Sequence, residues 1–367
     1  MKAIIKAFSA AILSVILSVA SHANEQVNEQ VKTDGGAFFG NLRVGYIVAE
    51  DAVGENTTSS AFGGKLGYVS ESWRGLTLGT TLYATQKLFN DENGDFFASD
   101  GESYAILGEI FVQGHFGNTE IKAGRFGFDS PYADTDDIRM VPNTFSGAML
   151  SNTDIANTTL YAVYIDEWSG VDSEKPEEFT ELNGDEGIFA IGAVFEGIDH
   201  LALQGWFYQG KDFTQLSYAE AMYEVGDFVL GAQLANQTDK TADSSGHDGD
   251  VYGVMASYAL NSFTYTVAYN GVSGTVTNGF GGGPYFTSSA EHTLADVLDQ
   301  KALAASVDYT GIDKLTLSVF YIDLDEDKHE TDLIAAYEFN DTMNIEAIYH
   351  HLYDDGDFFL VIFNMGF

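Results

Sequence analysis

Apolar and polar residues alternate along most of this chain with a period of two, which is the period of a β-strand with one apolar face. In one such run, Leu42, Val44 and Tyr46 alternate with Asn41 and Arg43. Runs of the same kind lie at 315–321, 333–339 and 345–349. The pattern therefore predicts an all-β chain.

The alternation predicts 18 strands, with 16 as the alternative count. We expect them at 38–50, 61–72, 76–88, 104–116, 119–129, 147–156, 158–170, 188–197, 200–210, 214–225, 227–239, 251–260, 263–274, 301–310, 314–323, 330–339, 343–352 and 358–367. An even count places both ends of the strand array on the same side of the sheet.

Two kinds of connector separate these strands. Short turns rich in Asn, Asp and Gly, such as 117–119 and 340–342, alternate with connectors that are mostly long and acidic. The long set comprises 51–60, 89–103, 130–146, 171–187, 241–250, 275–300, 324–330 and 353–357, and 211–214 is a short exception in an equivalent position. This asymmetry predicts a transmembrane antiparallel up-and-down β-barrel with long outer loops and short periplasmic turns.

The last strand, 358–367, carries the clearest membrane signal. One of its faces is fully apolar, and it consists of Phe359, Val361, Phe363, Met365 and Phe367. A terminal Phe on such a strand resembles the C-terminal signature that the barrel-assembly machinery of bacterial outer membranes reads. That machinery is therefore an expected partner, through Phe367.

The N-terminal residues have the features of a signal peptide. Lys2 and Lys6 precede an apolar run at 7–20, and Ser-His-Ala at 21–23 is an A-x-A-like cleavage site. The apolar run is too short for a membrane-spanning helix. We predict a signal peptide at 1–23, a flexible tail at 24–36 and an outer-membrane barrel at 37–367 with loop 130–146 folded inward.

The composition excludes several classes of function. The chain has no cysteine, so neither disulfides nor thiol chemistry contribute. Its net charge of −39 becomes −41 without the predicted signal peptide, which holds two lysines and no acidic residue. So acidic a chain repels nucleic acid, and no nucleic-acid partner is expected. The same charge favours cations in a water-filled lumen.

Alternation also places a set of charged side chains on the inner wall of the predicted barrel, because charges that face lipid are destabilising. The set comprises Arg43, Lys65, Glu120, Lys122, Asp308, Asp332, Glu338 and Glu346. Its carboxylates outnumber its basic groups, which again favours cations.

Residues 119–150 form the segment in which we expect function to be concentrated. They contain Lys122-Ala-Gly-Arg125, followed by Asp136-Asp137-Ile138-Arg139-Met140-Val141-Pro142-Asn143-Thr144-Phe145-Ser146-Gly147. This run is similar to a pattern of the OprD-like outer membrane porins, including their epsilonproteobacterial variants: an acidic residue, Arg, two apolar residues, Pro, any residue, Thr or Ser, Phe, any residue and Gly. The architecture extends the resemblance over the rest of the chain.

The resemblance implies an 18-stranded barrel in which the third long loop narrows the pore. Loop 130–146 would then form the constriction, with Asp134, Asp136, Asp137 and Arg139 beside it. Opposed charges across a narrow water column create a transverse field that orients dipolar solutes. The alternative is that these side chains only tie the loop down by local ion pairs.

The resemblance also implies a ladder of basic lumen residues that attracts carboxylate-bearing solutes. This chain departs from that expectation, because it has only four arginines, which are Arg43, Arg74, Arg125 and Arg139. A preference for carboxylate-bearing solutes is therefore in doubt for this chain.

Three weaker patterns favour structural roles. The acidic loop 90–102 fails the EF-hand spacing and is interpreted as solvated, although loose binding of divalent cations stays open. His350 and His351 face opposite sides of one strand, which predicts an aqueous rim and no metal site. The capping-box match at 288–291 predicts a short amphipathic helix in loop 275–300, over the mouth.

These observations give two hypotheses for a protein of the bacterial outer membrane. The first is a porin, a passive and cation-preferring diffusion channel for small hydrophilic solutes and ions. The second is an adhesin or envelope-structural barrel with acidic surface loops and a largely closed pore. The sequence lacks G-x-S-x-G, H-E-x-x-H and glycine-rich phosphate-loop motifs, so it predicts neither an enzyme nor a cofactor. Expected partners are outer-membrane lipids, lipopolysaccharide, solutes and ions, and a homotrimer is left open.

Overall fold

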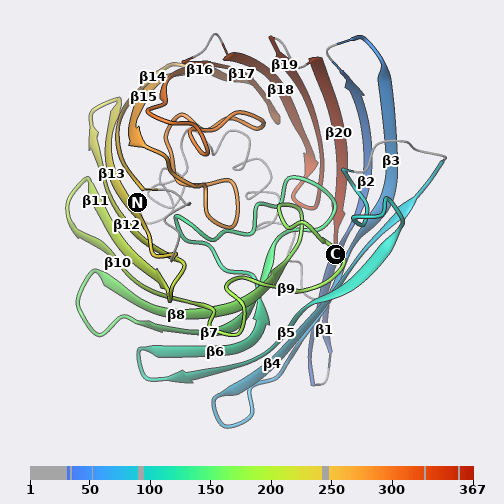
Figure 1. The fold of residues 1–367 in the computed structure, drawn as a ribbon. Coiled ribbons are helices and arrows are strands. Elements are labelled where there is room, and N and C mark those ends of the chain that lie inside the picture. Colours follow the sequence, from blue (N-terminus) through green and yellow to red (C-terminus); the bar gives the residue numbers. More distant parts are fainter. Residues whose placement is uncertain are drawn as a thin grey trace.

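The computed structural model describes residues 31–33, 35–51, 53–89, 95–241, 248–325, 328–353 and 356–367. These residues form a closed antiparallel β-barrel (Figure 1). The predicted signal peptide lies outside the described residues, as do most of the predicted tail and residues 90–94 of the acidic loop. Within the described part of the chain, no helix is long and apolar enough to cross a membrane.

Eighteen long strands form the barrel wall, which confirms the predicted number. They are β2 (Gly36–Glu50), β3 (Asn56–Ser70), β4 (Leu76–Lys87), β5 (Tyr104–Phe116), β6 (Thr119–Phe126), β7 (Thr144–Asn152), β8 (Thr158–Ser169), β10 (Ile188–Ile198), β11 (Leu201–Gly210), β12 (Thr214–Val225), β13 (Phe228–Asp239), β14 (Gly249–Leu260), β15 (Phe263–Gly274), β16 (Lys301–Ile312), β17 (Leu315–Leu324), β18 (Lys328–Asn340), β19 (Met343–Leu352) and β20 (Gly356–Gly366).

Two short strands accompany the wall. Strand β1 (Val31–Thr33) pairs with β2, and β9 (Thr180–Glu181) pairs with β8. Strand β1 lies inside the segment that was expected to be a flexible tail. The observed bounds of the wall strands follow the predicted ones closely, although β3 begins at Asn56, earlier than expected.

Wall strands that follow one another along the chain pair with each other, and β2 pairs with β20 to close the barrel. Arg43 stands opposite Asn364 in that ladder. At its end, the N–H of Gly40 donates to the carbonyl oxygen of Phe367 at 3.1 Å, and the N–H of Phe367 donates back to Gly40 at 3.0 Å. Closure satisfies the backbone within the wall, which a sheet in lipid requires.

The alternation along the strands matches the prediction. On β17, Val319 is 48% exposed on the outer face, whereas Phe320 and Ile322 are buried toward the inside. On β20, Phe359 is exposed and Leu360 is buried. Charged residues that alternate with the apolar outer set therefore face the lumen.

Among the described residues, the teal segment 127–143 between β6 and β7 and the orange segment 275–300 between β15 and β16 turn into the lumen, as Figure 1 shows. Both pack against the inner wall. One buried cluster includes Tyr132, Trp206, Tyr208, Tyr285 and Leu294, and a second includes Ile47, Phe96, Met140 and Phe358. The apolar core therefore lies between the inward connectors and the wall.

A glycine makes the turn into the second inward connector possible. Gly274, the last residue of β15, has a φ of +90°, and a Cβ there would lie 2.1 Å from the carbonyl oxygen of Asp248. Any other residue would clash with this backbone atom and would also adopt an unfavourable φ.

The helix predicted within 275–300 is wrong, because the connector contains no helix. The predicted capping box does not form, because Ser288 Oγ has no hydrogen-bond partner and Ser289 Oγ accepts from the N–H of His292 at 3.0 Å instead. The N–H groups of Glu291 and His292 donate to the Glu330 carboxylate on β18, at 3.3 and 2.9 Å. The wall thus binds the N–H groups that would begin a helix.

Candidate pore constriction

The first inward connector reaches the wall through an ion pair between Asp137 and Arg43 of β2. Nη2 of Arg43 donates to Oδ2 of Asp137 at 2.7 Å, and Nη1 contacts Oδ1, so the pair is bidentate. Both residues are buried, with 6% of Arg43 and 9% of Asp137 exposed. Bidentate Arg–carboxylate pairs fix geometry as well as charge, so this pair holds the connector at one place on the wall.

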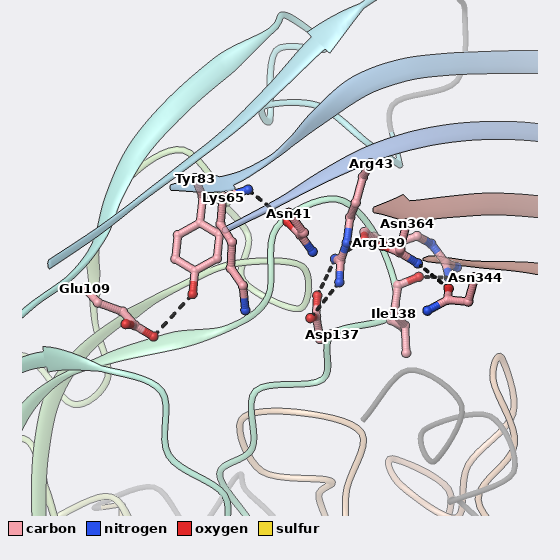
Figure 2. Close-up of polar contacts among 10 residues, drawn as sticks. All are labelled: Asn41, Arg43, Lys65, Tyr83, Glu109, Asp137, Ile138, Arg139, Asn344 and Asn364. Atoms are coloured by element: carbon pink, nitrogen blue, oxygen red, sulfur yellow. Dashed lines mark hydrogen bonds and ion pairs between the residues drawn. The ribbon is translucent and has the colours of Figure 1, made fainter. Parts of the chain in front are cut away.

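Arg43 also joins the connector to the closing seam of the barrel. Its Nη1 donates to the carbonyl oxygen of Arg139 at 2.8 Å, and its Nε donates to Asn364 Oδ1 on β20 at 2.8 Å. Nδ2 of Asn364 donates in turn to Asn344 Oδ1 on β19 at 3.1 Å. Figure 2 shows this network from the wall to the connector.

The environment of Asp137 keeps it ionised. Burial alone would raise the pKa of its carboxyl group, but the charge and hydrogen bonds of Arg43, with a contribution from Lys65, hold the pKa below its usual value. The connector and the wall therefore meet through opposite charges that neutralise each other.

A second polar group lies beside this pair on β3, β4 and β5. Tyr83 donates its hydroxyl to Glu109 Oε1 at 3.2 Å, and Thr81 donates to Oε2 at 2.8 Å. Lys65 points to the same region (Figure 2). Cationic and anionic groups thus alternate along this part of the wall.

A cluster of carboxyl groups links the first inward connector to the connector between β8 and β10. Asp136 hydrogen-bonds to Asp172, and Asn143 Nδ2 donates to Asp172 Oδ2 at 2.6 Å. Burial raises the pKa of Asp134 to about 8, helped by the nearby charges of Asp129 and Asp172. Burial, with the charges of Asp172 and Asp134, also raises the pKa of Asp136. Asp134 therefore holds a proton near neutral pH and contributes less than its formal charge.

Arg139 connects the two inward connectors. Its Nη2 lies 3.5 Å from Glu291 Oε1, and its guanidinium lies 5.1 Å from the ring centre of Phe358 on β20. Burial raises the pKa of Glu291, while the charges of Arg139 and His350 oppose that shift. Like Arg43, Arg139 thus lies beside a carboxylate of the lumen.

The backbones of the two connectors are also hydrogen-bonded to each other. The N–H of Phe280 donates to Tyr132 O at 2.9 Å, and the N–H of Asp134 donates to Phe280 O at 3.1 Å. The hydroxyls of Tyr132 and Tyr285 lie 3.3 Å apart. The sequence reasoning missed the inward path of 275–300. The glycine-rich run at 279–283 was the available signal, because it favours a close approach of backbone segments.

The remaining predicted wall charges lie on the inner faces of their strands, although their surroundings differ. Glu120 and Lys122 lie on β6, Asp308 on β16, Asp332 and Glu338 on β18, and Glu346 on β19. Glu338 is exposed, whereas Asp332 is completely buried. Lys122 places its ammonium group 4.9 Å from the ring centre of Phe111. Of the predicted wall residues, Arg43 and Lys65 belong to the group around Asp137, and the charge of Glu346 also interacts with that of Arg43.

The structure corrects the interpretation of His350 as a rim residue. His350 and His351 do face opposite ways, since His350 contacts Asp332 and His351 contacts Asp357. His350, however, is only 1% exposed and lies inside the barrel wall. The rim position holds for His351 alone.

A closed barrel of 18 strands with an apolar outer face and charged connectors folded inward defines a class, the outer-membrane porins. A family profile described as "outer membrane porin, OprD family" matches residues 86–309. The chain belongs to the OprD family. It is therefore an outer-membrane channel protein and not an enzyme, as predicted.

Related sequences and structures agree with this placement. The porin-like protein GalP of Pseudomonas putida is 26% identical over 144 residues, which are 37% of this chain and 34% of GalP. The matched part thus spans about a third of that curated relative.

Solved structures show the same fold over most of the chain. OpdK of Pseudomonas aeruginosa with vanillate has a TM-score of 0.78 at 19% identity, and OccK8 (OprE) of the same species has 0.77 at 17%. A BenF-like porin of Pseudomonas fluorescens has 0.75 at 19%. Each of the three alignments covers 90% of this chain and 98% of the other.

Proposed function

We propose that this porin is a passive diffusion channel for small hydrophilic solutes and ions that prefers cations. Loop 130–146 would form the constriction, with Asp134, Asp136, Asp137 and Arg139 beside the water column. We also propose that residues 1–23 direct export and that Phe367 is read by the barrel-assembly machinery.

The observation that carries the proposal is the pairing of the two arginines at the inward connectors. Arg43 is bound by Asp137, and Arg139 lies beside Glu291. Neither guanidinium therefore presents an uncompensated positive charge to an entering anion. Further carboxylates line the wall, among them Glu109, and the predicted mature chain is strongly acidic.

The same pairing argues against carboxylate-bearing solutes as the preferred cargo. OpdK was solved with vanillate, a carboxylate. In this chain, the guanidinium of Arg43 already holds a carboxylate of its own connector, so a solute carboxylate would have to compete with Asp137.

A largely closed barrel is the second candidate, and a specific observation favours it. The rings of Tyr132 and Tyr285, one from each connector, pack against each other, and Tyr132 also packs against Tyr208 and Tyr218 of the wall, which fills part of the lumen. Polar groups around Arg43 and Lys65 lie on another part of the wall and would leave a narrower, hydrated path beside the aromatic cluster.

The test is a single-channel recording of the full mature protein in a planar bilayer under a KCl gradient. A reversal potential of the sign set by K⁺ supports the proposal, and a chloride-selective value overturns it. If the folded protein inserts but gives no conductance steps, the closed barrel is the better description.

A further inference from the structure

A cluster of three ligating side chains lies apart from the constriction, at the loop ends of β18 and β19. Glu330, Asp332 and His350 each offer one ligand atom, and these atoms lie within 4.8 Å of one another. Glu330 and Asp332 are both 0% exposed, and His350 is 1% exposed. Two carboxylates are therefore buried beside a single imidazole.

The contacts of the cluster leave part of its hydrogen-bonding capacity unused. Nδ1 of His350 lies 2.7 Å from Asp332 Oδ1 and 3.7 Å from Glu330 Oε1. Oδ2 of Asp332 and Nε2 of His350 have no hydrogen-bond partner, although both atoms are buried. A buried carboxylate oxygen without a partner is costly, and a bound cation would supply the missing partner.

We propose that Glu330, Asp332 and His350 bind a divalent transition-metal cation of the Zn²⁺ type inside the barrel wall. A tetrahedral Zn²⁺ site with ligand distances of ~2.0–2.2 Å spaces its ligands by about 3.4 Å. The distances from His350 Nδ1 to Asp332 Oδ1 and to Glu330 Oε1, 2.7 and 3.7 Å, lie on either side of that value. A doubly charged ion would neutralise two carboxylates beside a neutral imidazole.

The ligand types select the class of metal. Imidazole nitrogen is a common ligand of Zn²⁺, Cu²⁺, Ni²⁺ and Fe²⁺, whereas Ca²⁺ and Mg²⁺ prefer sites made of oxygen atoms alone. A set of one nitrogen and two carboxylates therefore favours the transition metals over the more abundant hard cations.

The surroundings of Glu330 resemble the outer shell of a metal site. Its carboxylate accepts hydrogen bonds from Ser289 Oγ and from the N–H groups of Glu291 and His292. Such contacts orient ligating carboxylates. They come from the second inward connector, so the cation would hold that connector against the wall through Glu330.

The test is a Zn²⁺ titration of the full mature protein in detergent, after chelator treatment, with a chromophoric Zn²⁺ indicator as competitor. His350→Gln removes the nitrogen ligand, and His351→Gln is the matched control on the opposite face of the same strand. Glu338→Gln controls for loss of a carboxylate from β18. Barrel folding of each variant is checked by circular dichroism.

We expect one tight Zn²⁺ equivalent in the wild type and in both controls. His350→Gln should weaken it by 10-fold or more, following the effect of losing a metal-site residue. Equal binding in wild type and His350→Gln would overturn the proposal. Should His350→Gln fail to fold, anomalous diffraction at the zinc edge from wild-type crystals soaked in Zn²⁺ decides: a peak among the three side chains supports the site, and its absence there rejects it.

Discussion

The guanidinium of Arg43 and the carboxylate of Asp137 meet inside the barrel at 2.7 Å, although the residues are 94 positions apart in the sequence. One belongs to the first wall strand and the other to an inward connector. The pair therefore fixes how far the connector extends across the lumen, and it removes a free positive charge from the wall.

Asp137→Asn should release this connector. Removing one partner of a buried ion pair leaves the other charge uncompensated, at a cost of about 3–5 kcal/mol. In single-channel recordings, we expect higher mean conductance and more open-channel noise than in wild type. Asp154→Asn, in an exposed connector, is the control. The conductance of the double variant Arg43→Gln/Asp137→Asn should lie closer to that of wild type than the conductance of Asp137→Asn does. If Asp137→Asn leaves the conductance unchanged, other contacts position the connector.

The inward connector should loosen as the pH rises through about 8. Burial, with the charges of Asp129 and Asp172, raises the pKa of Asp134 to about 8 in the folded chain, far above its value when exposed. The folded form therefore binds an extra proton, and the stability that this proton contributes is lost as the pH approaches and passes about 8.

The measurement is hydrogen exchange of residues 130–146 from about pH 6 to about pH 9. The rates are corrected for the pH dependence of intrinsic exchange, and the amides of β18 serve as the internal reference. Protection should fall across this range in the wild type. Asp134→Asn, which lacks this proton, should show a smaller fall. A fall of equal size in Asp134→Asn would assign the effect to another group.

Glu109→Gln should reduce the preference for cations without moving the connectors. The amide keeps the shape of the side chain and can still accept from Tyr83, but it removes one charge from the wall. A unit charge ~8 Å from a permeating ion in water contributes about 0.5 kcal/mol, or roughly a twofold change in the permeability ratio. Glu71→Gln, in the connector between β3 and β4, should leave the reversal potential unchanged. An identical shift in both variants would contradict a local effect.

Gly274→Ala should destabilise the barrel or the inward path of 275–300. The added Cβ would lie 2.1 Å from Asp248 O, and the φ of +90° is unfavourable for alanine. Backbone strain alone costs about 1–3 kcal/mol, and the clash adds to it. Gly226→Ala is the control, because that glycine also has positive φ but a Cβ there meets nothing within 4 Å. Thermal unfolding in detergent should show a larger decrease for Gly274→Ala, and equal decreases would refute the role of the clash.

The sequence predicted the wall of this barrel well, for a physical reason. Lipid on one side imposes a strict apolar alternation, so residues such as Val319 and Phe320 have clear and opposite preferences. The asymmetry of the connectors then determines the number of strands. Family resemblance indicated loop 130–146 as the constriction, which stays a prediction, and in the structure Asp137 of that loop pairs with Arg43 of β2.

The contacts inside the lumen could not be predicted in the same way. The capping-box match at 288–291 has the local pattern of a helix start, but the N–H groups of Glu291 and His292 donate to Glu330, which lies 39 and 38 residues away from them. His350 was assigned to the rim because neighbouring histidines face opposite sides, and that argument gives no information about what lies across the lumen. Such contacts depend on the path of 275–300, which has no periodic pattern.

The hydrogen-bonded seam between β2 and β20 has a consequence for biogenesis. It joins Arg43 to Asn364, which are 321 residues apart, so the pairing that completes the ring is among the most non-local in the chain. Until that pairing forms, two strands carry unsatisfied edges that attract other chains. A nascent chain interrupted before β20 would thus yield an open, aggregation-prone sheet and not a narrower pore. Only the complete chain can therefore form a functional barrel.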